Sequence, residues 1–345
     1  MVTIREVAQR AGVSVKTVSR VVNDIPYVSA STRVRVEKAI RELGYVPNAP
    51  ARTLALQKTF TLGLVIPDIS SAALSLLVEG VEAICRESGY NLMLCTTGGD
   101  RDREEESTRQ LVRRQRIDGF ILLSDRLNVD FFFQLYQEGL PYVAVGRELP
   151  TDDIPQVYVD NRAGMAAAAT HLVGLGHQNI GYISCPIVTS TSVERLEGFE
   201  AALRQHGLGY ADRIYMDGKN HVEIGRAGMN LLLSKDTRPS AVCTFNDLIA
   251  LGALQVLKER QLRVPDDVAL VGFDDIQAAA FVEPALTTVH QPLYEMGATA
   301  TTLLMKLLQG EELTQRKVTL PVHLIIRQSC GGTRHAMATH SREGY

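Results

Sequence analysis

The sequence predicts two structural parts, a small all-helical N-terminal domain and a larger α/β core with two lobes. The first observation is a set of closely spaced amphipathic helical patterns within residues 1–46, and the second is an alternation of short apolar runs with helical patterns from Thr61 onward. The third is charge. Residues 1–58 contain ten basic and four acidic residues, whereas the remainder contains 26 basic and 35 acidic residues. A net charge of +6 indicates that only the N-terminal part is suited to a polyanion.

The N-terminal part begins with two short helices. Thr3 and Glu6 have the spacing of a capping box, Gly12 interrupts the first helical pattern, and Ser14 is a favourable N-cap for a second helix that ends near Asn23. Two short helices joined by a glycine turn predict a helix-turn-helix. A third helix is expected between the cap at residue 29 and the stop at residue 44. Its apolar residues are Val34, Val36, Ala39, Ile40 and Leu43.

The second helix carries residue types that suit the groove of DNA. Short polar side chains in this region can contact phosphate oxygens, namely Ser14, Thr17, Ser19 and Asn23. Val15, Lys16 and Arg20 can reach base edges. The alternative is that these residues are ordinary caps and solvated polar positions.

The string AGVSVKTVSRVVN, followed by VSASTRVRVEKAIRELGYVPNAPARTLA, resembles the DNA-binding headpiece of the lactose-repressor and galactose-repressor (LacI/GalR) family. The match runs without a gap from Thr3 to Ala55, and the resemblance continues through the family's effector-binding core to about Ser329. It implies an all-α helix-turn-helix headpiece followed by two Rossmann-like lobes that resemble periplasmic sugar-binding proteins.

The segment that follows the third helix is too short and too polar to hold a helix by itself in water. In the family the matching segment forms a hinge helix in the minor groove. The resemblance implies that Leu54 inserts between base pairs in the minor groove. It also implies that Ala51 and Ala55 allow two such helices to approach each other closely. Pro50 departs from many members, although proline suits the first turn of a helix.

The α/β pattern restarts after Asp160, which predicts two lobes with parallel sheets and helices on both faces. We place the headpiece at 1–46, the hinge at 47–59, the effector-binding core at 60–329 and a disordered tail at 330–345. Within the core, the first lobe is expected at about 60–158 and 290–318, and the second at about 159–287 and 319–329. The tail lacks a leucine heptad, which favours a dimer over a tetramer.

Ligands of open α/β sheets bind outside the carboxyl ends of the strands. The polar residues there suit a sugar, a nucleoside or another polyhydroxylated ligand. They are Asp68, Ser70, Ser71, Ser124, Asp125, Arg147, residues 184–195, Asn246, Asp247, Asp274 and Asp275.

The resemblance narrows this set. The strings RLEGF, TFND and VGFDD look like the family's effector contacts and carry over Arg195, Asn246 and Asp274. The remaining expected effector-binding residues are Ser71, Ser124, Arg147, Asn220 and Gln291. Helix capping would explain Asn246 and Asp247, and strand-end turns would explain Asp274 and Asp275.

The first lobe departs from the family where ligand identity is decided. Many members have Asn-Pro-Phe-Phe after the Pro-Asp-Ile-Ser string, whereas this chain has Ser-Ala-Ala-Leu, so the aromatic platform is missing. Where some members have another aromatic residue, this chain has Asn220 and His221. Arg147 and Lys219 suggest the hypothesis of an acidic or phosphorylated ligand.

Other classes find little support. The eight histidines and five cysteines show no metal or redox spacing, so we expect no metal, no cofactor and no catalytic residues. No G-x-G-x-x-G or P-loop string follows a strand. No apolar run approaches the roughly 18 residues of a membrane span and no export signal is evident, so we expect a cytoplasmic protein without membrane contact.

These observations predict a repressor that binds a pseudo-palindromic DNA operator as a homodimer and responds to a sugar or sugar derivative, with further phosphate contacts from Ser29 and Thr32. One alternative is an activator or a global regulator with a protein corepressor. A solute-binding receptor would need an export signal and no basic headpiece, and a sugar-acting enzyme is supported only by the strand-end carboxylates. The sign of the ligand's effect stays open.

Overall fold

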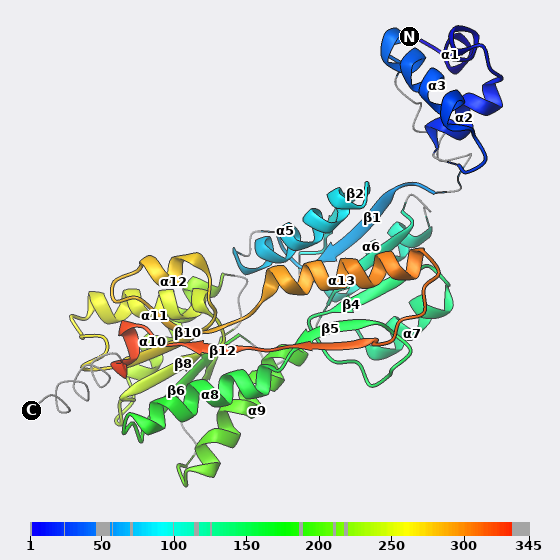
Figure 1. Cartoon of the computed structure of the whole chain (residues 1–345). Helices are drawn as coiled ribbons and strands as arrows, with labels where there is room; N and C mark the ends of the chain where they lie inside the picture. Colours follow the sequence, from blue (N-terminus) through cyan, green and yellow to red (C-terminus); the bar gives the residue numbers. More distant parts are fainter. Residues whose placement is uncertain are drawn as a thin grey trace, which may run out of the picture. The chain divides into compact units, whose positions relative to one another are not determined.

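The computed structural model describes residues 2–23, 25–45, 56, 58–69, 72–98, 100–113, 117–124, 126–185, 189–209, 212–216 and 220–332. The chain divides into two compact units (Figure 1). One comprises Met1–Thr61 with Arg116–Asp118, and the other comprises Leu62–Gln115 with Gly119–Tyr345. We call them the headpiece and the core.

The headpiece contains three helices, α1 (Ile4–Ala11), α2 (Val15–Val22) and α3 (Ala30–Leu43). The predicted capping box is confirmed, because Thr3 N donates to Glu6 Oε2 at 2.7 Å and the Thr3 hydroxyl accepts from Glu6 N. The predicted caps Ser14 and Ser29 also accept from the backbone amide of the third residue of their helices. Gly12 has φ +65°, a left-handed conformation that suits glycine at the turn between α1 and α2.

A small apolar cluster holds the three headpiece helices together. Its buried members are Val7, Ala8, Ala11, Val18, Val21, Val36 and Ala39. Val34, which we expected on the apolar face of α3, is 60% exposed, so that expectation is wrong. Only one side of α3 contacts α1 and α2, and it is the side of Val36, Ala39, Ile40 and Leu43.

The first lobe of the core is built on a six-stranded sheet in the order β11-β5-β4-β3-β1-β2. Its elements are β1 (Thr61–Ile66), α5 (Ala72–Glu87), β2 (Asn91–Thr96), α6 (Arg101–Arg113), β3 (Gly119–Leu123), α7 (Val129–Gln137), β4 (Tyr142–Val145), β5 (Gln156–Val159), α13 (Leu293–Leu308) and β11 (Lys317–Leu320). Helix α13 packs against α5 although the two are far apart in sequence.

The second lobe has a six-stranded sheet in the order β12-β10-β9-β8-β6-β7. Its elements are α8 (Asn161–Gly174), β6 (Ile180–Ser184), α9 (Ser190–Gln205), β7 (Arg213–Tyr215), α10 (His221–Leu233), β8 (Ala241–Thr244), α11 (Asp247–Glu259), β9 (Ala269–Asp274), α12 (Gln277–Phe281), β10 (Thr287–His290), β12 (His323–Ile325) and the 3-10 turn η1 (Gln328–Cys330). Strand β12 pairs antiparallel with β10, an exception to the predicted parallel sheet.

The chain passes between the lobes three times, after β5, after β10 and after β11. The strands beside these passages, β5, β10, β11 and β12, have no clear apolar run, and sequence inspection did not anticipate them. Strand β10 shows why. It begins with two fully buried threonines, Thr287 and Thr288, whose hydroxyls donate to Cys330 Sγ and to Asp247 Oδ1. Such tertiary partners permit polar residues inside a sheet.

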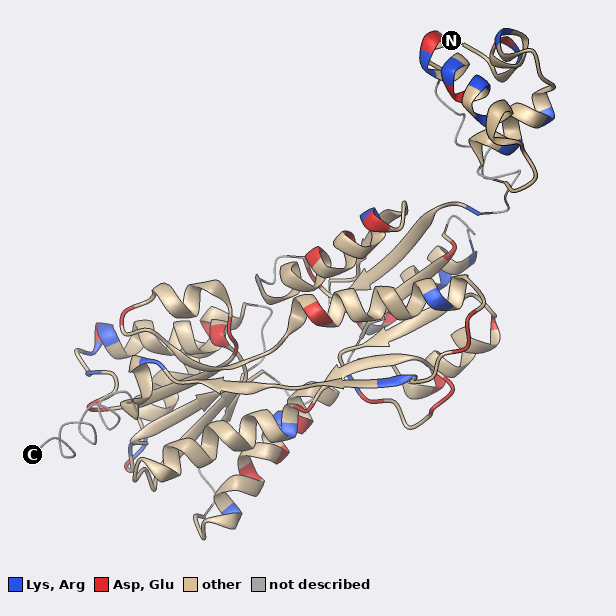
Figure 2. Cartoon of the chain, in the orientation of Figure 1, with Lys and Arg blue, Asp and Glu red and all other residues tan. Residues whose placement is uncertain are grey.

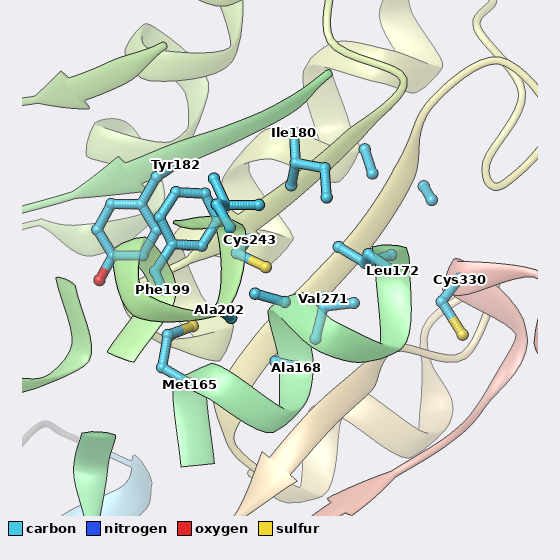
Figure 3. Packing of buried hydrophobic residues seen from close by; sticks show 14 of the residues in the cluster. Met165, Ala168, Leu172, Ile180, Tyr182, Phe199, Ala202, Cys243, Val271 and Cys330 are labelled. Atoms are coloured by element: carbon cyan, nitrogen blue, oxygen red, sulfur yellow. The ribbon is translucent and has the colours of Figure 1, made fainter. Parts of the chain in front are cut away.

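One buried cluster of the second lobe lies between its sheet and the helices α8 and α9 (Figure 3). The Tyr182 and Phe199 rings stack with centroids 5.0 Å apart. Cys243 and Cys330 belong to the same buried cluster, as expected for cysteines that act as small core residues. Cys330 is therefore packed, although we assigned it to the tail. The rest of the expected tail, 333–345, lies outside the described residues.

Candidate functional site

The expected DNA-contacting residues lie on and around α2 of the headpiece. Val15 is 42% exposed, Lys16 is exposed and Arg20 is half-buried. These side chains are thus available to a partner of the isolated headpiece, whereas Val18 and Val21 of the same helix are buried. Lysine and arginine occur on the headpiece helices in Figure 2.

Three of the five expected phosphate-contacting residues are helix caps, namely Ser14 and Ser29 at N-termini and Asn23 at the C-terminus of α2. The Ser14 hydroxyl accepts from Thr17 N at 3.1 Å, and the Ser29 hydroxyl accepts from Thr32 N at 3.3 Å. Asn23 Nδ2 donates to Ser19 Oγ at 3.3 Å. For Ser14 and Ser29, capping and phosphate contact are compatible, because both place polar groups at a helix N-terminus, where backbone amides favour an anion. The expected hinge residues Ala51, Leu54 and Ala55 lie outside the described residues.

A cavity of about 190 Å³ lies between the two lobes of the core. Five of the eight expected effector-binding residues line it, namely Ser124, Arg195, Asn246, Asp274 and Gln291. The other described lining residues are Pro67, Ala73, Leu74, Leu123, Val145, Gly146, Asn161, Thr191, His221, Phe245, Leu293 and Met296. The structure thus brings together expected residues that are up to 167 positions apart in the sequence, from Ser124 to Gln291.

Arg195 is the centre of the polar wall. Its Nε donates to Asn161 Oδ1 at 3.0 Å, and its Nη1 donates to the Phe245 carbonyl at 2.6 Å. Nη1 also lies 3.3 Å from Asp274 Oδ1. The guanidinium carbon is 3.7 Å from the centroid of the Phe273 ring. A charged group this buried, with only 4% of its side chain exposed, is tolerable because each of these contacts offsets lost hydration.

Asp274 receives two contacts on one carboxylate oxygen. Gln291 Nε2 donates to Asp274 Oδ1 at 2.7 Å, and Arg195 approaches the same atom. Burial raises the pKa of Asp274, whereas Arg195 and Gln291 act in the opposite direction. The Asp274 backbone, at the end of β9, has φ +109°, which is an uncommon conformation for a residue other than glycine.

Asn246 and His221 form a second polar pair in the cavity wall. Asn246 Oδ1 accepts from Ile249 N and caps α11, while its Nδ2 lies 2.7 Å from His221 Nδ1. Helix capping and a place in the expected effector site are therefore compatible for Asn246, because the same side-chain amide caps α11 and lines the cavity. Burial and then Arg195 lower the pKa of His221, so the imidazole is neutral at pH 7. In the neutral ring Nδ1 accepts from Asn246, which leaves Nε2 as a donor.

Asp247 and Asp275 have protein partners instead of facing the cavity. Asp247 Oδ2 accepts from Ile276 N at 2.9 Å, and its Oδ1 accepts from Thr288 Oγ1 at 2.5 Å. Asp275 contacts Arg327 Nη2 at 2.7 Å and His290 Nδ1 at 3.0 Å. Both carboxylates tie neighbouring strand ends together.

Three expected effector-binding residues are not in the described lining. Arg147 Nη1 donates to the Leu127 carbonyl at 3.0 Å, and its guanidinium lies 5.9 Å from the Phe132 ring. Asn220 caps α10 through contacts to Val222 N and Glu223 N. The third, Ser71, lies outside the described residues. Arg147 therefore contacts Leu127 and Phe132 of its own lobe. Burial raises the pKa of Glu194 on α9 of the second lobe, and the charge of Arg147 is among those that act in the opposite direction. Asn220 has a structural role as the cap of α10.

Sequence reasoning missed Asn161, which anchors Arg195, and most of the apolar lining. Asn161 is the second residue after the end of β5, so the rule that selected the other strand-end residues would have pointed to this segment had β5 been recognised. Leu293 and Met296 lie on α13 after the second passage between lobes, and no local pattern distinguishes them from core residues. Their role depends on tertiary packing.

The described residues include neither a metal-ligand cluster nor a membrane-spanning helix. No group of three or more histidine, cysteine, aspartate or glutamate side chains there could hold a metal ion. None of the helices in that part of the chain is long and apolar enough to cross a membrane.

Comparison with known proteins agrees with this architecture. Residues 3–48 match the family model described as bacterial regulatory proteins, lacI family, and residues 169–330 match a periplasmic binding protein-like domain. The ribose operon repressor of Escherichia coli (strain K12) is 38% identical over 332 residues, which cover 95% of this chain and 100% of that protein. Catabolite control protein A of Priestia megaterium is 35% identical over 329 residues, with 95% and 99% covered.

Solved structures show the same likeness. The lac repressor dimer bound to operator and the anti-inducer ONPF has a TM-score of 0.83 at 28% identity, with 95% of this chain and 99% of that chain covered. The complex of the transcriptional regulator CelR with cellobiose has a TM-score of 0.72 at 35% identity, with 95% and 100% covered. The helix-turn-helix headpiece and the two-lobed core define a ligand-regulated DNA-binding repressor, and these relatives are regulators, not enzymes. The chain belongs to the lacI family of bacterial regulatory proteins.

Proposed function

We propose that a small neutral sugar or close derivative binds in the cavity between the lobes and sets the operator affinity of a homodimer. The observation that carries this proposal is the charge balance of the lining. Arg195 and Asp274 lie 3.3 Å apart, and His221 is neutral at pH 7. The described lining therefore offers many hydrogen-bonding groups and no excess charge.

The size of the cavity supports a small ligand. Its volume of about 190 Å³ is below the roughly 300 to 1,000 Å³ of pockets for drug-sized molecules. Among the relatives, one is named for the ribose operon and another was solved with cellobiose. These names support a sugar, and the available volume favours a monosaccharide.

An acidic ligand finds less support than the sequence suggested. Arg147 donates to Leu127 O and is outside the described lining, while Lys219 lies outside the described residues. Arg195 already faces a carboxylate in Asp274. A phosphate placed beside that pair would meet the Asp274 charge in a poorly hydrated site, which is unfavourable.

In the DNA-binding half of the proposal, Val15, Lys16 and Arg20 contact bases in the major groove. Ser14, Thr17, Asn23, Ser29 and Thr32 contact phosphates, and Leu54 enters the minor groove with Ala51 and Ala55 at the hinge contact. One headpiece presents few base contacts, and a two-fold dimer on a pseudo-palindrome doubles them. The relative solved with operator is a dimer, which supports this arrangement.

Control would follow from a difference in ligand affinity between two arrangements of the lobes. The cavity is lined from both lobes, so a bound ligand stabilises the arrangement in which both walls contact it. If that arrangement changes the pairing of the hinge segments, ligand binding changes the free energy of operator binding. Operator binding then changes the free energy of ligand binding by the same amount.

The test is isothermal titration calorimetry of the full chain with neutral sugars and with their phosphates and uronates. It is followed by fluorescence anisotropy on an operator selected from random DNA, with and without the tightest ligand. We expect a neutral sugar to bind and to change operator affinity. We expect Asp274→Ala to abolish binding and the exposed control Asp236→Ala to leave it unchanged. Tight binding of a phosphorylated sugar alone, or binding without any effect on operator affinity, would contradict the proposal.

A further inference from the structure

The carboxylate of Asp118 binds the two residues that precede β1. Thr59 N and Thr59 Oγ1 donate to Asp118 Oδ1 at 2.6 and 2.8 Å. Phe60 N donates to Asp118 Oδ2 at 3.0 Å. Both oxygens of one side chain therefore hold consecutive residues of a segment that lies 58 and 59 positions away in the sequence. We call these contacts the Asp118 clamp.

The backbone inside the Asp118 clamp has an uncommon conformation. Phe60 has φ +52°, in the left-handed region that a bulky residue rarely adopts. Thr59 Oγ1 accepts from Thr61 N, and Thr61 Oγ1 donates to Thr59 O, each at 3.3 Å. Such a conformation persists only where surrounding contacts hold it. The path of the chain into β1 therefore depends on Asp118, which is outside this segment.

Asp118 is attached to a rigid part of the first lobe. It directly precedes β3, and its backbone N donates to Thr61 O at 2.8 Å, next to the parallel pairing of β1 with β3. Both strands are interior to the sheet, and their residues Leu64 and Ile121 are fully buried. Close packing of this kind leaves the strands little freedom to move. The Asp118 clamp thus joins the start of the sheet to Thr59, the last residue of the segment that we place as the hinge.

The position of the hinge matters for a dimer on a pseudo-palindrome, because two headpieces must reach two half-sites at a fixed spacing. If the chain can rotate freely between the hinge and the sheet, the conformational freedom of that segment is lost when both headpieces bind. The effective concentration of the second headpiece at its half-site then falls. Random DNA imposes no half-site spacing, so binding to it is affected less.

We propose that Asp118 is a positioning residue for operator binding. Its clamp fixes the point and the direction in which the hinge leaves the first lobe, and this fixes the spacing of the two headpieces of the dimer. The role requires no contact between Asp118 and DNA. The inference rests on the proposed homodimer and its pseudo-palindromic operator, and it adds which side chain of the first lobe holds the hinge.

Asp118→Asn tests the clamp without changing the shape of the side chain. An amide has one acceptor oxygen and one donor nitrogen, so the variant sets a donor against the backbone N of either Thr59 or Phe60. Lys58 is exposed and directly precedes the clamp, so the rate of tryptic cleavage after Lys58 reports on the order of this segment. We expect mass spectrometry to show cleavage after Lys58 at least about fivefold faster in folded Asp118→Asn than in the wild type.

Fluorescence anisotropy of the full chain on a selected operator and on random DNA tests the positioning role. We expect Asp118→Asn to weaken operator binding at least about tenfold and binding to random DNA less than about twofold. Thr59→Val keeps the shape of its side chain and removes one donor to Asp118. It should weaken operator binding about threefold, and it tests the inference independently of Asp118→Asn. Asp130→Asn, at an exposed position on α7 of the same lobe, is the matched control and should leave both affinities unchanged.

Two kinds of result separate this inference from the function on which it rests. Operator affinity within about twofold of the wild type in both folded variants, or an equal loss on operator and random DNA, would overturn the inference while dimeric operator binding stands. Sedimentation of the wild-type complex gives the number of chains on each operator. One chain for each operator would contradict the proposed homodimer, and the inference would fail with it.

Discussion

Gln291 Nε2 donates a 2.7 Å hydrogen bond to Asp274 Oδ1, the carboxylate oxygen that also lies 3.3 Å from Arg195 Nη1. Gln291 directly follows β10, where the chain leaves the second lobe for the first. The passage between lobes is therefore bonded to the centre of the polar wall. A ligand that contacts Asp274 would also act on a segment that connects the two lobes.

Replacement of Gln291 tests this relationship. Gln291→Met keeps the length of the side chain and removes the donor to Asp274. We expect sugar affinity, measured by calorimetry, to fall at least about tenfold, since a buried carboxylate loses a hydrogen bond of roughly 1.5 to 3 kcal/mol. Operator binding without ligand should persist. Gln309→Met, on the exposed end of α13, is the control. Unaltered sugar affinity in Gln291→Met would show that the bond does not serve the ligand.

Arg20→Ala tests base recognition by α2. We expect operator affinity to fall by about 1 to 3 kcal/mol while affinity for random DNA falls much less, because a base contact contributes only on the correct sequence. Fluorescence anisotropy on both DNAs gives the two values. The exposed Arg41 on α3 provides the control Arg41→Ala, which removes the same charge from the headpiece. Equal weakening on both DNAs by Arg20→Ala would assign the side chain to phosphate contact.

Gly198 allows α8 and α9 to approach closely. A Cβ at this position would lie 2.2 Å from the Arg162 carbonyl oxygen, and backbone cannot move away as a side chain can. We expect Gly198→Ala to lower the free energy of unfolding by about 1 to 3 kcal/mol or more. Gly174→Ala, with nothing within 4 Å of the added carbon, should be neutral or stabilising. Urea unfolding measures both, and similar midpoints for the two variants would be inconsistent with this packing.

Asp247 makes stability depend on pH. Burial, with a further contribution from Asp274, raises the pKa of Asp247 well above its usual 3.8. Between pH 3.8 and the raised folded-state pKa, Asp247 is protonated in the native protein and ionised in the unfolded chain. The native state therefore binds one more proton in this window, and lowering the pH through it increases the free energy of unfolding. We expect the difference in unfolding free energy between wild type and Asp247→Asn to grow as the pH is lowered from 7 to 4. Urea titrations at each pH check this, with Asp236→Asn as control. A pH-independent difference would refute the assignment.

Much of the headpiece could be predicted because its structure is encoded locally. Thr3, Ser14 and Ser29 cap helices through amides three residues away, and Gly12 supplies the turn. Local hydrogen bonds of this kind leave a signature at fixed spacing. Val34 was misjudged because burial on α3 depends on where α1 and α2 pack, which spacing alone does not specify.

The sequence by itself determined the class of the protein, the three headpiece helices and the alternation of strands and helices, because capping, turns and hydrophobic periodicity act over a few residues. Tertiary structure decided the rest. The buried threonines of β10 are tolerated in a strand because their hydroxyls donate to Asp247 and Cys330. Asn161 belongs to the polar wall because its side chain accepts a hydrogen bond from Arg195. Leu293 and Met296 line the cavity because α13 packs on the first lobe after a passage from the second. These contacts join residues far apart in the chain, and only folding brings them together.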